Sequence, residues 1–236
     1  MSKTDRVWAV VPAAGIGSRM QADKPKQYLQ LEDKAVLAHT LERLASHPEI
    51  EGIVLALAEQ DPWWPQLNLS LDCPLLIAEG GEERADSVLN ALALLQQYDA
   101  DDPWVMVHDA ARPCLRHVDI DRMLATLRMH EVGGILGIPV TDTVKRVTAD
   151  NTIEETVDRK GLWRAATPQM FRLNLLKTAL QMAAEQGETV TDEAGAIELA
   201  GWQPMMVEGH SDNIKITVPQ DLALAHLFLQ QQRGEK

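Results

Sequence analysis

The segment 12–28, PAAGIGSRMQADKPKQY, combines small residues with positive charges in a way that suits phosphate binding. Small residues let a ligand approach the backbone closely, so that backbone N–H groups can surround phosphate oxygens. Cationic side chains within the next dozen residues can neutralise the phosphate charge. An ordinary strand-to-helix turn with solvated cations is the alternative. The residues concerned are Ala13, Ala14, Gly15 and Gly17, followed by Arg19, Lys24 and Lys26.

This loop departs from the two common phosphate-binding templates. A P-loop requires Gly-Lys-Ser/Thr, whereas Gly17 is followed by Ser18 and Arg19. A dinucleotide fingerprint requires a third Gly or Ala three residues after Gly17, where this chain has Met20. It also requires an acidic residue at the end of the second strand, which is missing here, so a dehydrogenase is disfavoured.

A second candidate lies in WVMVHDAARP at 104–113, where Asp109 directly follows an apolar run. If that run is a buried strand, Asp109 lies at the carboxyl edge of a sheet and is placed to bind a Mg²⁺ ion held mainly by phosphate oxygens. Arg112 follows one turn later. Capping of the next helix is the alternative role for Asp109. We interpret His108 as a packed strand residue rather than a ligand.

The segment 80–88, GGEERADSV, places two glycines before a predicted helix that has Ser87 in its first turn. Its backbone amides and the serine hydroxyl can face a flat polar ring, although a plain helix N-terminus is the alternative. A lysine in an apolar strand is costly unless its ammonium group reaches an anion or solvent. Further candidates are scattered along the chain: Arg159, Thr167, Thr191 and Lys215.

The pattern of apolar residues predicts the elements that position these side chains. Short apolar runs alternate with longer amphipathic segments, which indicates an α/β fold with a Rossmann-like, mostly parallel sheet and helices on both faces. Ligands bind such sheets at the carboxyl ends of the strands. The predicted strands are 7–11, 52–58, 75–78, 104–109, 133–140, 204–208 and 214–217, and the predicted helices are 35–46, 84–97, 118–130, 173–186, 191–200 and a last one with Thr217 as its N-cap.

The segment 141–159 breaks this rhythm, because polar and apolar residues mix at a short period around Asp150. It predicts a β-hairpin that protrudes as an arm. A lone hairpin is marginally stable, so it must pack against a second subunit or against its own domain. We expect a single domain over 1–236 with an inserted arm at 141–159.

Composition limits the class of protein further. The chain carries 22 Lys+Arg against 35 Asp+Glu, a net charge of −13, and 45% of its residues are hydrophobic. This excludes a disordered chain and argues against nonspecific nucleic-acid binding. Cys73 and Cys114 are too few for a disulfide scaffold or a zinc cluster. Without a signal peptide or a membrane-spanning segment, we expect a cytoplasmic protein with no membrane or nucleic-acid partner.

Several segments in order resemble the 2-C-methyl-D-erythritol 4-phosphate cytidylyltransferase family of the non-mevalonate isoprenoid pathway. They are VPAAGIGSRM with KPKQY, GGEERADSV, VHDAARP, TVDR, TPQ, TDEA and DNIKIT, and they span nearly the whole chain. The first loop is shared with wider nucleotidyltransferases, whereas the combination of VHDAARP, TVDR and NIK is narrower. The resemblance implies transfer of CMP from CTP to the phosphate of 2-C-methyl-D-erythritol 4-phosphate, with release of pyrophosphate.

The resemblance also implies roles for particular residues. Arg19 and Lys26 would hold the CTP triphosphate, Lys215 the α-phosphate and the acceptor side, and Asp109 the Mg²⁺ cofactor. The residues that would bind the nucleotide are Ala13, Ala14, Gly15, Gly17, Gly81 and Ser87, with Ala13, Gly81 and Ser87 in contact with the cytosine. Those that would bind the acceptor are Arg112, Thr143, Arg159, Thr167 and Thr191, with Thr143 and Arg159 reaching over from the arm of the partner in a homodimer.

The chemistry of the reaction agrees with these residue types. A phosphate monoester, with a second pKa of about 6, is mostly ionised at neutral pH and needs no general base. The enzyme must instead bring two polyanions together and stabilise the growing charge. The alternatives are a ribitol 5-phosphate (or other polyol or sugar phosphate) cytidylyltransferase and a catalytically silent nucleotide-binding domain.

Overall fold

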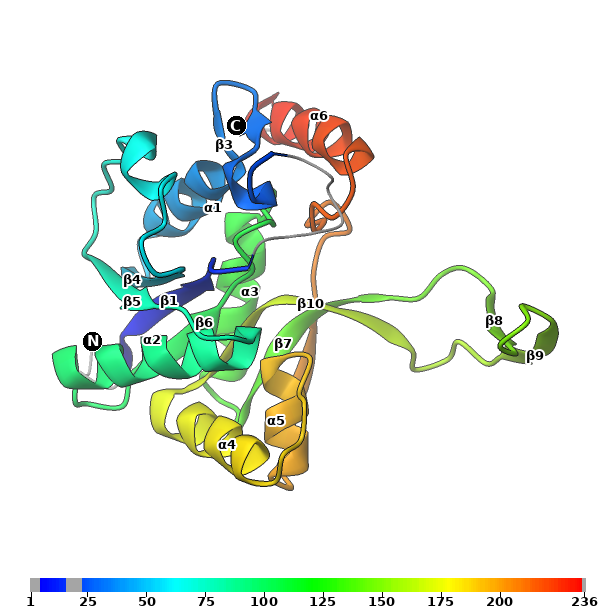
Figure 1. Ribbon diagram of the computed structural model, residues 1–236. Coiled ribbons are helices and arrows are strands. Elements are labelled where there is room, and N and C mark those ends of the chain that lie inside the picture. The colour runs from blue at the N-terminus through cyan, green and yellow to red at the C-terminus, as the bar shows by residue number, and fades with distance from the viewer. Residues whose placement is uncertain (1–4, 16–22, 235–236) are drawn as a thin grey trace.

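The structure, a computed structural model, describes residues 5–15 and 23–234. Its main sheet has seven strands in the order β11-β7-β10-β6-β1-β4-β5 (Figure 1). All neighbours pair in parallel except β10, which is antiparallel to both β6 and β7. The predicted α/β class is thus confirmed. The strands are β1 Val7–Pro12, β4 Ile50–Leu57, β5 Leu75–Glu79, β6 Trp104–Val107, β7 Gly133–Pro139, β10 Trp163–Arg172 and β11 Met205–Glu208.

Helices cover both faces of this sheet, as the apolar pattern predicts. Side chains of β1 alternate between two core clusters, with Val7, Ala9 and Val11 in one and Trp8 and Val10 in the other. The first cluster also contains residues of α1 (Val36–Ala45) and α3 (His117–Leu127), and the second contains residues of α2 (Arg84–Tyr98), α4 (Leu173–Glu185) and α5 (Glu193–Leu199). The central strand is therefore buried on both sides, and only Pro12 at its carboxyl end is partly exposed.

The sequence pattern does not predict the antiparallel strand β10. It contains Pro168, which cannot donate to a ladder, and buried polar residues, Thr167 and Gln169. Its register on β7 shifts between Ala165 and Gln169. The break in regular pairing places Thr167 at the carboxyl end of β6, next to Asp109.

The predicted strand at 214–217 is wrong, because the structure describes these residues as irregular chain. Their apolar pattern has another origin: Ile216 is buried against the last helix, α6 (Gln220–Gly234). Thr217 is not the N-cap either, because α6 begins at Gln220 and the Thr217 hydroxyl donates to the Lys215 carbonyl at 3.1 Å. The Asp221 carboxylate accepts the backbone N–H groups of Thr217 and Val218.

The predicted hairpin is present as β8 (Val144–Val147) and β9 (Ile153–Val157), with Asn151 in the left-handed region at φ 64°. It projects away from the main sheet as an arm (Figure 1). Among the residues that the structure describes, these two strands pair only with each other. The arm leaves apolar side chains in solvent, such as Ile153 at 62% exposure.

The remaining short elements lie around the first loop and α1. They are η3 (Lys26–Tyr28), β2 (Gln30–Leu31), β3 (Lys34–Ala35) and η4 (Trp64–Leu67). Within 5–15 and 23–234, every helix is too short or too polar to cross a membrane.

Candidate active site

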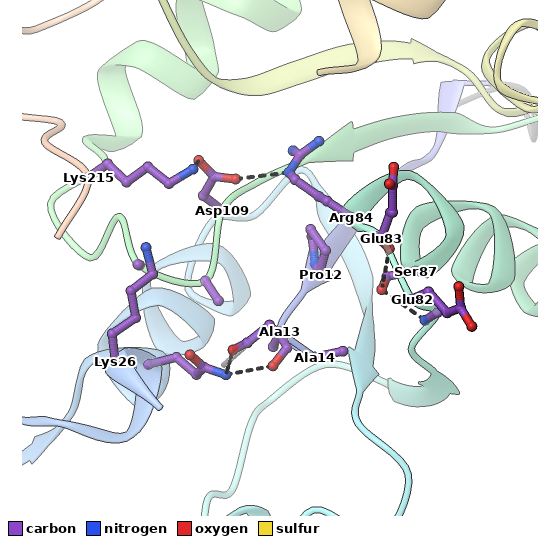
Figure 2. Close-up of a pocket in the computed structure, with 15 residues that line it drawn as sticks. Pro12, Ala13, Ala14, Lys26, Glu82, Glu83, Arg84, Ser87, Asp109 and Lys215 are labelled. Carbon is purple, nitrogen blue, oxygen red and sulfur yellow. Dashed lines mark hydrogen bonds and ion pairs between the residues drawn. The ribbon is translucent and has the colours of Figure 1, made fainter. Parts of the chain in front are cut away.

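A cavity of about 260 Å³ opens at the carboxyl ends of β1 and β6, where the start of α2 also reaches the sheet edge (Figure 2). Residues far apart in the sequence meet there, as expected for a parallel sheet. Of the predicted site residues, those that line it are Ala13, Ala14, Gly15, Lys26, Gly81, Ser87, Asp109 and Lys215.

The first loop is held in place by a residue that the sequence analysis did not single out. Gln27 is buried, and its side-chain amide donates to the carbonyls of Ala13 at 2.7 Å and Gly15 at 3.0 Å. The loop carbonyls are thereby turned toward Gln27. Gly17 and Arg19, both predicted to bind the nucleotide, lie outside the described residues.

The segment 80–88 forms the opposite wall of the cavity. The Ser87 hydroxyl accepts the Gly81 N–H at 3.0 Å and donates to the Glu83 carbonyl at 3.2 Å. A Cβ atom at position 81 would lie 2.2 Å from the Cβ of Asp86, so only glycine fits there. Glu83 and Asp86 complete a capping box at the start of α2. Ser87 therefore shapes the loop that faces the cavity.

Asp109 is surrounded by cations. Its Oδ2 lies 3.0 Å from Lys215 Nζ and 3.2 Å from Arg112 Nε, and its Oδ1 lies 3.3 Å from Arg84 Nε. Burial alone would raise the pKa of Asp109, but the charges of Arg84, Lys215 and Arg112 hold it well below the usual range. The carboxylate is ionised at neutral pH. It does not cap the next helix, since α3 begins at His117.

A second cavity of about 170 Å³ adjoins the first. Arg84, Asp109 and Lys215 line both, so a charged cluster forms their common wall. The predicted acceptor residues in the smaller cavity are Arg112, Thr167 and Thr191.

Behind Asp109, a buried histidine organises the end of β6. His108 Nε2 lies 3.0 Å from the Arg112 carbonyl, so Nε2 carries the proton. Its Nδ1 then accepts from the Thr167 hydroxyl at 3.0 Å, and that hydroxyl accepts the Asp109 N–H at 3.0 Å. Burial lowers the pKa of His108 to about 4. His108 is a packed residue, as interpreted from the sequence.

Two charged residues of the site were missed by the sequence analysis. Arg84, the first residue of α2, pairs through both terminal nitrogens with Glu193, the first residue of α5, at 2.7 and 3.1 Å. Both residues belong to segments singled out above, GGEERADSV and TDEA. The available signal was their position at helix starts beside the sheet edge, but no local pattern links residues 109 positions apart.

Two predicted residues lie away from both cavities. Thr143 and Arg159 are at the base of the arm, where Arg159 donates to the Thr141 carbonyl. Lys26, in contrast, donates to the Ile216 carbonyl at 3.1 Å, which holds its ammonium group beside the chain that carries Lys215.

An α/β sheet with a small-residue loop, clustered cations and a buried, ionised carboxylate at its carboxyl edge is the arrangement expected of a nucleotidyltransferase. The sequence profile described as 2-C-methyl-D-erythritol 4-phosphate cytidylyltransferase matches residues 7–231. The chain belongs to this family.

Similar proteins cover nearly the whole chain. The enzymes of that name from Aliivibrio fischeri and Vibrio vulnificus are 51% and 53% identical to it, and each alignment covers 97% of this chain and 96% of the relative. The solved structure of the Francisella tularensis enzyme is 36% identical with a TM-score of 0.81, covering 95% of this chain and 100% of that one.

Proposed function

We propose that this protein transfers CMP from CTP to the phosphate of 2-C-methyl-D-erythritol 4-phosphate. An acceptor phosphate oxygen attacks the α-phosphorus of CTP, the bond from that phosphorus to the β-phosphate breaks, and pyrophosphate leaves. The product is 4-diphosphocytidyl-2-C-methyl-D-erythritol. The observation that carries the proposal is the pair of adjoining cavities with Arg84, Asp109 and Lys215 in their common wall, in a chain of this family.

In this proposal CTP occupies the larger cavity. Its base lies against the backbone of the first loop and of the segment with Gly81 and Ser87, and its triphosphate is held by Lys26 together with Arg19. The acceptor lies in the smaller cavity, with its phosphate near Arg112. The residues in the common wall then face both phosphates, where repulsion between two polyanions is the main barrier to reaction.

The site also fits a divalent cation. Asp109 supplies an ionised carboxylate, and Mg²⁺ in nucleotide enzymes is bound by one or two carboxylates plus substrate phosphates. Lys215, which contacts Oδ2, has a side chain 38% exposed and has room to turn toward a phosphate. We infer that Asp109 holds Mg²⁺, which neutralises phosphate charge when bound.

We further propose that the chain forms a homodimer in which the arm at 141–159 serves the partner. The arm extends away from its own sheet (Figure 1). Apolar side chains of the arm are exposed, and Thr143 and Arg159 lie outside the cavities of their own chain. In a dimer they would complete the acceptor cavity of the other subunit.

The test measures pyrophosphate release from CTP with each of two acceptors, 2-C-methyl-D-erythritol 4-phosphate and ribitol 5-phosphate, with Lys26→Ala as a control. We expect turnover with the first acceptor and its loss in the variant. Comparable turnover of ribitol 5-phosphate would overturn the acceptor assignment. Absence of turnover with every nucleotide and acceptor would indicate a silent binding domain.

A further inference from the structure

Glu193 is a carboxylate without any solvent exposure, directly behind the wall shared by the two cavities. Both of its oxygens accept hydrogen bonds from Arg84, at 2.7 Å from Nη1 and 3.1 Å from Nη2. This two-point geometry requires the ionised carboxylate. Burial raises the pKa of Glu193, and the Arg84 charge opposes that rise.

Arg84 therefore contacts two carboxylates, Glu193 and Asp109. Its terminal nitrogens bind Glu193, and its Nε lies 3.3 Å from Asp109 Oδ1, a longer contact than either bond to Glu193. The guanidinium group is anchored on Glu193 and touches Asp109 with one edge. Lys215 and Arg112 contact the other Asp109 oxygen.

Loss of the Glu193 charge would release two strong donors next to Asp109. A guanidinium group prefers to bind a carboxylate with two parallel hydrogen bonds. Arg84 would then bind Asp109 Oδ1 with its terminal nitrogens, while Lys215 and Arg112 contact Oδ2. In that arrangement Asp109 could not also bind a cation.

A purely stabilising role accounts poorly for this pair. Removing a carboxylate–guanidinium pair from water costs about as much free energy as the pair returns, so apolar residues of similar volume would stabilise the fold as well. Here Arg84 of the buried pair also contacts Asp109, which is the only carboxylate that touches three cations among the described residues. Its position points to a role in the site.

We propose that Glu193 is a positioning residue. It binds the terminal nitrogens of Arg84 and keeps them away from Asp109, so that Asp109 stays available to a divalent cation that is bound to the substrate phosphates. The inference rests on the proposed function in one respect, the assignment of Asp109 as the metal ligand. Glu193 itself touches neither cavity.

The test compares CTP binding with and without Mn²⁺ by isothermal titration calorimetry, with no acceptor present so that no turnover occurs. In Glu193→Gln, which keeps the shape and removes the charge, the gain in CTP affinity caused by Mn²⁺ should fall about tenfold or more. CTP affinity without metal should change little. Glu198→Gln, an exposed position on the same helix, is the matched control.

The double variant Arg84→Gln/Glu193→Gln decides between positioning and plain support. Without Arg84 no guanidinium group can turn onto Asp109 Oδ1, and only Lys215 and Arg112 remain, on Oδ2. CTP affinity should fall with and without Mn²⁺, because Arg84 faces the phosphates, but the Mn²⁺-dependent gain should return toward that of the wild type. An unchanged gain in Glu193→Gln, or a double variant no better than the single one, would overturn the proposal. If Glu193→Gln does not fold, Arg84→Gln is tested alone: CTP affinity should fall equally with and without Mn²⁺, because Arg84 faces the phosphates, and loss of the Mn²⁺-dependent gain there refutes the idea.

Failure of this inference can be told apart from failure of the proposed function. In one outcome, the wild type turns over CTP while the rise in CTP affinity caused by Mn²⁺ is the same in Asp109→Asn. That result would refute the role of Glu193 and leave the cytidylyl transfer intact. A wild-type chain without turnover would refute the transfer itself.

Discussion

His108 should make the folded protein sensitive to mild acid. It has no solvent exposure, and burial lowers its pKa from the ordinary 6.5 to about 4. The folded state therefore favours the neutral ring. Its stabilising contribution is complete above about pH 6.5 and is lost as the pH falls toward 4.

The size of the effect follows from these pKa values. Since one pKa unit corresponds to about 1.4 kcal/mol, the neutral ring contributes about 3 kcal/mol, of which about 2 kcal/mol is lost by pH 5. Both burial and hydrogen-bond geometry disfavour the protonated ring. Protonation would place a second N–H on Nδ1, which now accepts from the Thr167 hydroxyl.

The assay is urea unfolding at pH 7.5 and pH 5.0, for the wild type and for His108→Gln. Glutamine keeps an amide donor that can bond the Arg112 carbonyl, and it does not titrate. The variant should be less stable at pH 7.5, and its loss of free energy of unfolding on going to pH 5.0 should be smaller by about 2 kcal/mol.

Other titratable groups do not account for a difference between the wild type and His108→Gln. The lowered pKa of Asp109 acts below its ordinary value of 3.8, and the raised pKa of Glu193 acts in the opposite direction to that of His108. Both groups are present in the two proteins, so their contributions cancel in the difference. An equal loss of stability in the wild type and in His108→Gln would refute the reasoning.

Two further predictions concern the reaction. Lys215→Ala should lower the rate of the chemical step about 100- to 1,000-fold, because it removes a cation from the wall shared by the cavities, and rapid-quench measurements on the folded variant check this; near wild-type turnover would show that Lys215 has no catalytic role. Mixing Arg159→Ala with Lys26→Ala subunits should restore activity, because each heterodimer then has one site with an intact Lys26 and an intact arm. A purified heterodimer that stays inactive would indicate that the arm does not serve the partner.

The sequence predicts the parts of the fold that follow from local periodicity. The alternation of apolar runs and amphipathic segments places β1, β6 and α2, and hence residues 13–15 of the first loop, Asp109 and Ser87, at one sheet edge. A parallel sheet gathers the carboxyl ends of its strands whatever the details of packing. For this reason most predicted nucleotide residues within the described chain line one cavity.

The failures occur where neighbours distant in sequence decide the local structure. The chain at 214–217 has an apolar pattern typical of a strand, but it packs under α6 instead of joining a ladder. The strand β10 is concealed by Pro168 and by polar side chains that find partners only in the folded protein, such as Thr167 with Asp109.

The sequence by itself determined that an acidic chain places a small-residue loop, two lysines and an aspartate along an α/β sheet. Only the tertiary structure decided which charges meet. Arg84 is shared by Asp109 and Glu193, 25 and 109 positions away, and Lys215 reaches Asp109 from the far end of the chain. Periodicity reports which face of an element is buried, whereas the pairing of charges depends on side-chain geometry across elements that only packing brings together.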